Sequence, residues 1–417
     1  MKDFFEIIES SSNFELRRLT ERLREGLFDP LGVRLLTATE SLIGREFDRG
    51  VKALAGNSHA HLCICGAYGQ GKSHSLTYTR QRALRQGFVT SQINLDPRET
   101  PLHLLHEVYR ALVNNISFPN NETSLVKQWE RYVKQLSDQA KEEGSQALLN
   151  LPEEIPHLFK AVLAGFAQNT ISLSDREKRL KKHADFRPYE FSHLLSRALL
   201  GEALPSHRLR TVFKYRQVSF YKEASLTCRG WEPYLGLIRG LARLFKQMGF
   251  KGWVLLFDEG ESVAQARINS RSKSYEILHQ MIFPELPVPG LYPVFAFTDD
   301  FFLQVRQEDY DLVSVRGGIE SPYFERDYAS AWDGLNVCRL HDLTPMEWKD
   351  LSKKLIEIHT RAYGWQPLEP KIRRRMARRL TETRTQEARL KFKALVDQLD
   401  LIHQGQVLSL EESIPGS

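Results

Sequence analysis

The spacing of apolar residues predicts helices near the start of the chain. Leucines recur at helical intervals between residues 14 and 27, which indicates an amphipathic helix that ends before Asp29 and Pro30. A turn-like stretch is expected after it. A second helical stripe runs over residues 41–54, and the polar sequence that starts at Gly56 predicts its end.

From residue 61 the pattern changes to that of a βαβ unit. Short apolar runs over residues 61–65 and 88–95 predict strands, and residues 74–86 between them predict a helix that Gly87 closes. Another helix is expected over residues 102–113. Two strands joined through a helix pair in parallel, so this order implies an α/β fold with a parallel sheet flanked by helices.

The rest of the chain divides into parts of different character. Polar, charged and helix-rich sequence with proline breaks indicates an insertion, and two buried strands over residues 253–257 and 291–297 indicate that the sheet resumes. Only helical signals follow, beginning with the cap-like Thr344-Pro345. The predicted domains are an N-terminal helix with the first part of the core (1–113), a helical insertion (114–230), the second part of the core (231–340), a helical lid (341–403) and a tail (404–417).

Composition narrows the class of protein. Of 417 residues, 41% are hydrophobic, which is enough for a well-buried core. The sequence contains neither a long apolar run nor a signal-peptide pattern, so we expect a cytoplasmic protein. The four cysteines fit neither a disulfide framework nor a zinc site. A formal charge of +6 and a pI near 9.0 permit contact with nucleic acid.

The sequence GAYGQGKS after the first predicted strand fits the phosphate-loop pattern G-x-x-x-x-G-K-S/T at every fixed position. Its glycines let backbone N–H groups converge on phosphate oxygens, and the following helix adds the positive end of its dipole. We expect Lys72 to reach the β and γ phosphates of ATP and the Ser73 hydroxyl to ligate Mg²⁺. The predicted nucleotide contacts are Gly66, Ala67, Tyr68, Gly69, Gln70, Gly71, Lys72, Ser73 and His74.

Two acidic residues, Asp258 and Glu259, follow the buried strand over residues 253–257. Carboxylates at the end of a buried strand are costly unless a cation neutralises them. Asp258 is therefore predicted to hold Mg²⁺ through its water shell, and Glu259 to orient and deprotonate the attacking water. The nearby Glu261 is interpreted as a solvated helix-cap residue.

Further residues are weaker candidates for catalysis. Thr298 and Asp299 end the next predicted strand, where a polar group can touch the γ-phosphate or the attacking water; a simple turn closing the strand explains them equally well. Arg316 and Arg326 lie downstream, at a distance that suits an arginine finger acting on a neighbouring subunit, and surface charge is the competing interpretation.

In the lid, residues 392–399 carry an apolar helical stripe. Arg389 lies three residues before Phe392, on the same side of the helix as this stripe, which predicts that the arginine points inward. It could reach the bound phosphates or form a capping ion pair. Another lid helix carries a basic stripe of Lys371, Arg374, Arg375 and Arg378, which indicates either DNA phosphate binding or a solvated surface. The run over residues 178–182 in the insertion is a similar, weaker candidate.

With these residues in view, the chain resembles the ATP-binding proteins of BREX anti-phage defence systems, a P-loop family related to AAA+ ATPases of the origin-recognition type. The segments that carry the resemblance are IGRE at 43–46, CGAYGQGKSHSL at 65–76, GFKGWVLLFDEGE at 249–261, and Ala388-Arg389 ahead of Leu399-Asp400. The insertion matches poorly. Ala388 stands where the resemblance leads us to expect proline.

The resemblance implies further roles. It places Ile43, Gly44 and Arg45 against the adenine, and Arg389 near the phosphates as the lid arginine. It also implies a part in phage restriction beside other defence proteins, such as a helicase. Fold-level analogy does not assign a substrate.

Several functions stay open at this point. The chain could be an ATPase motor or switch that acts with DNA and forms an ATP-dependent homo-oligomer. It could instead be a slowly hydrolysing regulatory adaptor without direct DNA binding. A small-molecule phosphotransferase is a third class, against which the Asp258-Glu259 pair argues, because a glutamate beside the Mg²⁺ ligand suits water as the acceptor.

Overall fold

The computed structural model describes residues 4–142, 149–171, 188–216, 218, 226–308, 324, 328–365, 369–382 and 387–404. The chain forms two compact units. Unit 1 comprises Met1–Arg45, Ile64–Thr79 and Cys338–Ser417, and unit 2 comprises Glu46–Cys63 and Arg80–Val337. The domain boundaries expected from the sequence divide the chain into continuous ranges, whereas these units are discontinuous, so those boundaries stay a prediction.

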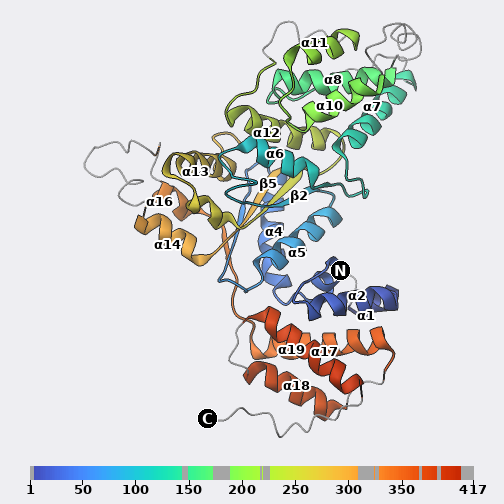
Figure 1. Ribbon diagram of the computed structural model, residues 1–417, viewed down its shortest axis with the longest axis vertical. Coiled ribbons are helices and arrows are strands. Elements are labelled where there is room, and N and C mark those ends of the chain that lie inside the picture. The colour runs from blue at the N-terminus through green and yellow to red at the C-terminus, as the bar shows by residue number, and fades with distance from the viewer. Residues whose placement is uncertain are drawn as a thin grey trace. The chain divides into compact units, whose positions relative to one another are not determined.

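A six-stranded sheet has the strand order β3-β2-β4-β5-β1-β6 (Figure 1). Strand β2 pairs in parallel with β4, and β4 pairs in parallel with β5, whereas the short β3 is antiparallel to β2. The mixed α/β class is therefore confirmed, with a mostly parallel sheet flanked by helices. The strands are β1 (Leu62–Cys65), β2 (Val89–Asn94), β3 (Ile116–Ser117), β4 (Trp253–Asp258), β5 (Leu291–Phe297) and β6 (Val337–Arg339).

Burial explains why β4 and β5 form at the places that the sequence predicts. Every residue of both strands is buried, as expected for central parallel strands that helices cover on both faces. Phe257 and Phe295, which are register partners, stack with ring centroids 4.6 Å apart. The polar edge of Trp253 is satisfied as well, because its indole N–H donates to Ser91 Oγ at 3.0 Å.

Helices α7, α8, α10 and α11 pack together as a separate group within unit 2, as Figure 1 shows. The helical insertion was expected to lack strands altogether, and β3 corrects that expectation: its two residues extend the sheet beside β2. The elements of unit 2 outside the sheet are α6 (Leu105–Asn114), α7 (Leu125–Glu142), α8 (His157–Ile171), α10 (Pro188–Leu199), α11 (Ser206–Tyr215), α12 (Glu232–Gln247), η2 (Gly260–Gln265), α13 (Ile268–Ile282), α14 (Asp299–Glu308), α16 (Tyr328–Ala331) and η3 (Trp332–Gly334).

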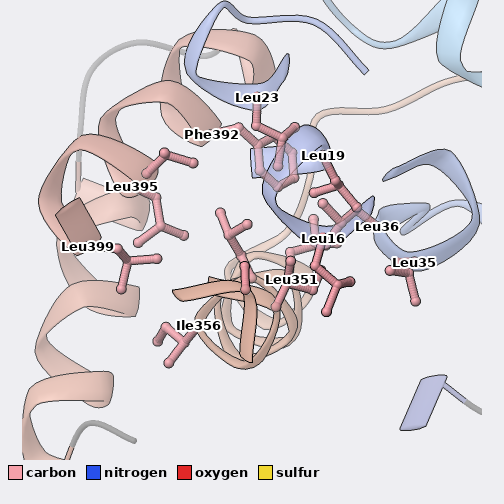
Figure 2. Close-up of a cluster of buried hydrophobic side chains, with 14 of the residues drawn as sticks. Leu16, Leu19, Leu23, Leu35, Leu36, Leu351, Ile356, Phe392, Leu395 and Leu399 are labelled. Carbon is pink, nitrogen blue, oxygen red and sulfur yellow. The ribbon is translucent and has the colours of Figure 1, made fainter. Parts of the chain in front are cut away.

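Unit 1 brings the two ends of the chain into one hydrophobic core (Figure 2). Leu16, Leu19 and Leu23 line one face of α2 and pack with apolar residues of α17 and α19. The helices of this unit are α1 (Phe4–Ser10), α2 (Asn13–Arg24), α3 (Pro30–Leu36), α17 (Pro345–Tyr363), α18 (Pro370–Glu382) and α19 (Ala388–His403). Two more helices, α4 (Glu40–Ala55) and α5 (Lys72–Arg85), contribute residues to both units.

Local sequence signals set several helix ends in unit 1. Thr344 and Glu347 form the capping box of α17, with Pro345 at the first helical position, as the sequence predicts. The sequence predicts a turn-like stretch after α2, and this prediction is wrong over residues 30–36, which form the helix α3. Asp29 caps that helix by accepting the Gly32 N–H at 2.7 Å.

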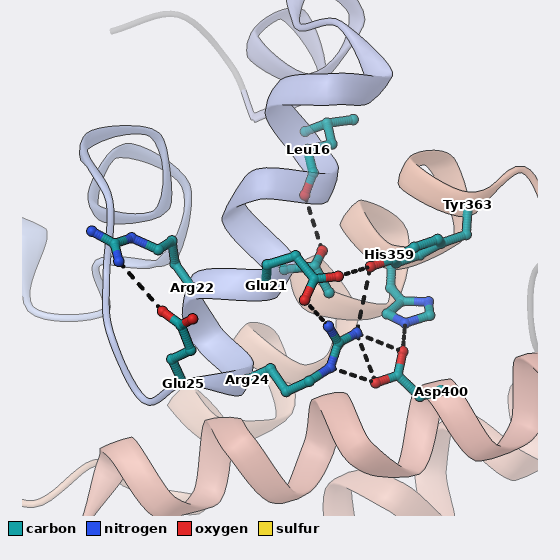
Figure 3. A network of polar contacts seen from close by, with 9 residues as sticks. Leu16, Glu21, Arg22, Arg24, Glu25, His359, Tyr363 and Asp400 are labelled. Atoms are coloured by element: carbon teal, nitrogen blue, oxygen red, sulfur yellow. Dashed lines mark hydrogen bonds and ion pairs between the residues drawn. The ribbon is translucent and has the colours of Figure 1, made fainter.

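A polar network lies beside this core and joins α2, α17 and α19 (Figure 3). Arg24 donates to both carboxylate oxygens of Asp400, at 2.9 and 3.0 Å. The buried His359 accepts from the Trp365 indole N–H at Nδ1, so its proton sits on Nε2 and is donated to Asp400 at 3.0 Å. Burial lowers the pKa of His359, which keeps this neutral form.

We expect Asp400→Ala to destabilise the protein by about 2–3 kcal/mol, because it leaves the His359 N–H and part of the Arg24 guanidinium without their acceptor. Urea unfolding of the full chain would measure this. The matched control is Glu25→Ala, which removes a carboxylate from the exposed Arg22–Glu25 pair of the same figure and should cost less than about 0.5 kcal/mol. Equal losses in the two variants would contradict a structural role for the network.

Candidate functional site

The GAYGQGKS loop lies in unit 1, between the end of β1 and the start of α5. Gly69 and Gly71 have φ values of +84° and +92°, in the left-handed region that favours glycine. Gly66 is buried, and an ideal Cβ on it would lie 2.8 Å from the Gln70 Oε1. Helix α5 begins at Lys72, so the loop ends at a helix N-terminus. The backbone thus favours glycine at 69 and 71, and at 66 a side chain would crowd Gln70 and Leu340.

Lys72 turns back over the loop. Its ammonium group donates to the carbonyls of Gly66 and Ala67, at 3.0 and 3.2 Å. The following Ser73 is exposed, and the Tyr68 side chain is 82% exposed. These two bonds hold the ammonium group against the backbone at the start of the loop.

Gln70 fixes the loop from within and ties it to the lid. Its carbonyl oxygen accepts the Ala67 N–H at 2.8 Å, and its amide donates to Asp342 Oδ1 at 2.8 Å. Nearby, an ideal Cβ on Gly69 would lie 3.2 Å from Glu387 Cγ, so the Glu387 side chain passes close to the loop. Neither Asp342 nor Glu387 carries a sequence signal that could have identified it.

His74, the second residue after the lysine, contacts the segment over residues 28–37. Its Nε2 lies 2.8 Å from Thr37 Oγ1, and its ring meets the ring of Phe28 edge-on at 4.7 Å. Burial lowers the pKa of His74 to about 4, so the ring is neutral near pH 7. The His74 side chain thus packs against residues 28 and 37, and its predicted contact with the nucleotide stays a prediction.

The adenine and lid candidates of unit 1 occupy different environments. Ile43 and Gly44 are buried in α4, whereas Arg45 is exposed. The inward direction expected for Arg389 is wrong, because this residue is exposed in the first turn of α19. Its aliphatic part packs on Gly26, where an ideal Cβ would lie 2.9 Å from Arg389 Cγ.

The acidic candidates lie in unit 2, at the end of β4. Asp258 is only 6% exposed, and its Oδ1 accepts the Glu259 N–H at 3.0 Å. Glu259 is exposed and has φ 55° and ψ 40°, a left-handed conformation that costs a non-glycine residue about 1 kcal/mol. An ideal Cβ on Gly260 would lie 2.7 Å from the Ala296 carbonyl oxygen, so close packing beneath fixes this turn. Strain of this kind persists mainly at functional sites.

The adjacent strand supplies the next polar group. Thr298 follows the last residue of β5, and its N–H donates to Glu261 Oε2 at 3.2 Å. Glu261, interpreted from the sequence as a solvated helix-cap residue, is partly exposed in the first turn of η2, and its carboxylate also joins η2 to the end of β5. Thr298 and Asp299 are both partly buried there, Asp299 being the first residue of α14.

The chemistry of these groups suits Mg²⁺. Carboxylate and hydroxyl oxygens are its preferred ligands, and the ion keeps several waters, so one or two protein ligands are enough. Asp258 and Ser73 offer such oxygens. Within the described residues no three His, Cys, Asp or Glu side chains group as a metal site.

Helix α18 presents the basic stripe that the sequence predicts. Lys371, Arg374, Arg375 and Arg378 are exposed, and Met376 is buried beneath them. The remaining basic candidates, Arg316, Arg326 and the run over residues 178–182, lie outside the described residues. In the part of the chain that is described, no helix is long and apolar enough to cross a bilayer.

Comparison with known proteins identifies one family. The sequence model described as BREX system ATP-binding protein BrxC/D matches residues 12–176 and 230–416, and the longest unmatched stretch is part of the insertion. A search of curated proteins and a search of solved structures found no match. Because the matched segments span most of the sequence, the chain belongs to the BrxC/D family of BREX system ATP-binding proteins.

Proposed function

We propose that this protein is an ATP-hydrolysing switch or motor of an anti-phage defence system. Family membership implies ATP binding and a role in phage defence. The observation that carries the proposal further is the loop over residues 66–73, whose two left-handed glycines lead into Lys72 at the start of α5. This conformation turns backbone N–H groups and a helix N-terminus toward an anion.

The proposed roles follow from the chemistry of each side chain. Lys72 exchanges the carbonyls of Gly66 and Ala67 for the β and γ phosphate oxygens, which are stronger acceptors because they are charged. The Ser73 hydroxyl and Asp258 hold Mg²⁺, which when bound neutralises charge on the phosphates. Glu259 orients the attacking water and takes its proton.

The remaining candidates take supporting roles in this proposal. Thr298 and Asp299 touch the γ-phosphate or the attacking water, and Ile43 to Arg45 contact the adenine. Arg389 reaches the phosphates from the exposed first turn of α19, a position from which a long side chain can swing. As in related P-loop ATPases with a lid, the fold would be of the AAA+ type.

The proposal includes assembly. Other proteins of the defence system, a helicase among them, are the expected partners, and ATP favours a homo-oligomer in which Arg316 or Arg326 reaches a neighbouring site. Mass measurement with ATP and with ADP tests this. An identical mass in both nucleotides would remove the ATP-dependent oligomer from the proposal.

Glu259→Gln is expected to keep ATP binding and to lower the hydrolysis rate by about 10²–10⁴-fold, because the general base is lost. Phosphate release measures the rate. The matched control is Glu261→Gln, which keeps an acceptor for the Thr298 N–H and should hydrolyse ATP nearly as fast as wild type.

Lys72→Ala should weaken ATP binding by at least about tenfold, since a charged hydrogen bond to phosphate disappears. Titration with a fluorescent ATP analogue measures this affinity.

The Glu259→Gln variant also separates the switch or motor from a slowly hydrolysing adaptor. If Glu259→Gln loses hydrolysis but retains assembly and phage defence, hydrolysis is dispensable and the adaptor is the better description. If defence is lost together with hydrolysis, the motor or switch stands.

Direct DNA binding is a second part of the proposal, favoured by the basic face of α18. Four exposed cations on one helix face can follow a phosphate backbone, and each contact releases counterions. The described sequence of this helix contains a single acidic residue, Glu382, at its last position.

Replacing Lys371, Arg374 and Arg375 with alanine should weaken DNA binding and reduce the slope of log affinity against log salt by about 1 for each lost phosphate contact. Fluorescence anisotropy with duplex DNA, with and without ATP, measures both. As a control, Lys349→Ala with Lys353→Ala removes exposed charge from α17 and should leave the slope within about 1 of wild type. A wild-type protein with no affinity at low salt would rule out direct DNA binding.

A further inference from the structure

A continuous series of ring contacts leads from the phosphate loop to the lid core within unit 1. His74 meets Phe28 edge-on with ring centroids 4.7 Å apart, and Phe28 meets Phe392 of α19 edge-on at 5.3 Å. Phe392 in turn contacts Trp348 of α17 at 5.4 Å. Edge-to-face pairs have a directional preference, so a shift of one ring disturbs the next.

A hydrogen bond fixes the first ring of the series. The single proton of the Thr37 hydroxyl is donated to the Val33 carbonyl, so Thr37 Oγ1 must accept from His74 Nε2–H. Thr37 ends α3, and Phe28 lies just before that helix. His74 is thus held by the segment over residues 28–37 through a hydrogen bond and a ring contact.

The place of His74 in the chain makes this packing relevant to the nucleotide. It follows Lys72 and Ser73 in the first turn of α5, and the Ser75 N–H donates to Gly71 O at 2.9 Å. A turn bonded in this way moves as one piece. Any displacement of Lys72 and Ser73 toward phosphates therefore carries the His74 ring with it.

We propose that His74 and Phe28 are positioning residues that transmit ATP binding at the phosphate loop to helix α19, through the contact of Phe28 with Phe392. The inference rests on the proposed ATP binding of the loop. Neither residue touches the nucleotide: the hydrogen bond to Thr37 keeps the His74 ring against Phe28, and Phe392 belongs to the buried core that holds α19.

The test measures amide hydrogen exchange of α17 and α19 in the full chain, with ATP and with no nucleotide, alongside ATP affinity. In wild type, ATP should slow exchange in α19. Phe28→Leu, which keeps apolar volume but loses the aromatic edges, should reduce this ATP-induced protection about two- to tenfold while ATP affinity stays within about threefold. Phe28→Tyr keeps the ring and should restore the response.

Two further variants keep the inference falsifiable. Phe14→Leu is the matched control, because the Phe14 side chain is 73% exposed on α2, and it should respond like wild type. Should Phe28→Leu fail to fold, Thr37→Val decides. It removes the acceptor for the His74 N–H, along with the bond from the Thr37 hydroxyl to the Val33 carbonyl, and should reduce the ATP-induced protection of α19 in the same way.

The outcomes separate the two proposals. A wild-type protein that binds ATP without any change in α19 overturns the coupling and leaves the proposed function intact, and so does a folded Phe28→Leu with the wild-type response. A wild-type protein that does not bind ATP overturns both.

Discussion

The apolar contact of α2 with α17 and α19 is the interaction on which unit 1 depends. Leu16, Leu19 and Leu23 form one continuous buried cluster with apolar residues of the lid helices. The phosphate loop is in the same unit, and His74 contacts Phe28, which packs against this core. Removal of the α2 stripe would therefore loosen the loop as well as the lid.

Much of this fold was predictable from apolar spacing. The buried strands β4 and β5 and the capped start of α17 carry signals that are complete within a few residues. The elements that were missed lack such signals: β3 and β6 span only two and three residues, and α3 is a seven-residue helix. Short elements like these form because tertiary neighbours complete them, which a local pattern does not record.

The residues of the candidate site likewise divide into those that the sequence predicts and those that only the fold reveals. The glycine positions and Lys72 follow from the requirements of a phosphate-binding loop, and the strained Glu259 follows from a motif that places it after a buried strand. Asp342, Glu387, Thr37 and Phe28 could not be found in this way, since each meets the loop only through folding. Arg389 shows the limit of a helical stripe: at the first turn of a helix, the neighbouring turn that would cover the side chain is absent, so the residue stays exposed.

The bond between Arg24 and Asp400 joins residues 376 positions apart in the sequence. During synthesis the leucine face of α2 is therefore made long before α17 and α19, and it stays incompletely buried until those helices have been made. An amphipathic helix whose apolar face is exposed can bind chaperones or aggregate. Truncation that removes α19 would expose part of the leucine face of α2, as well as the side of α17 that α19 covers.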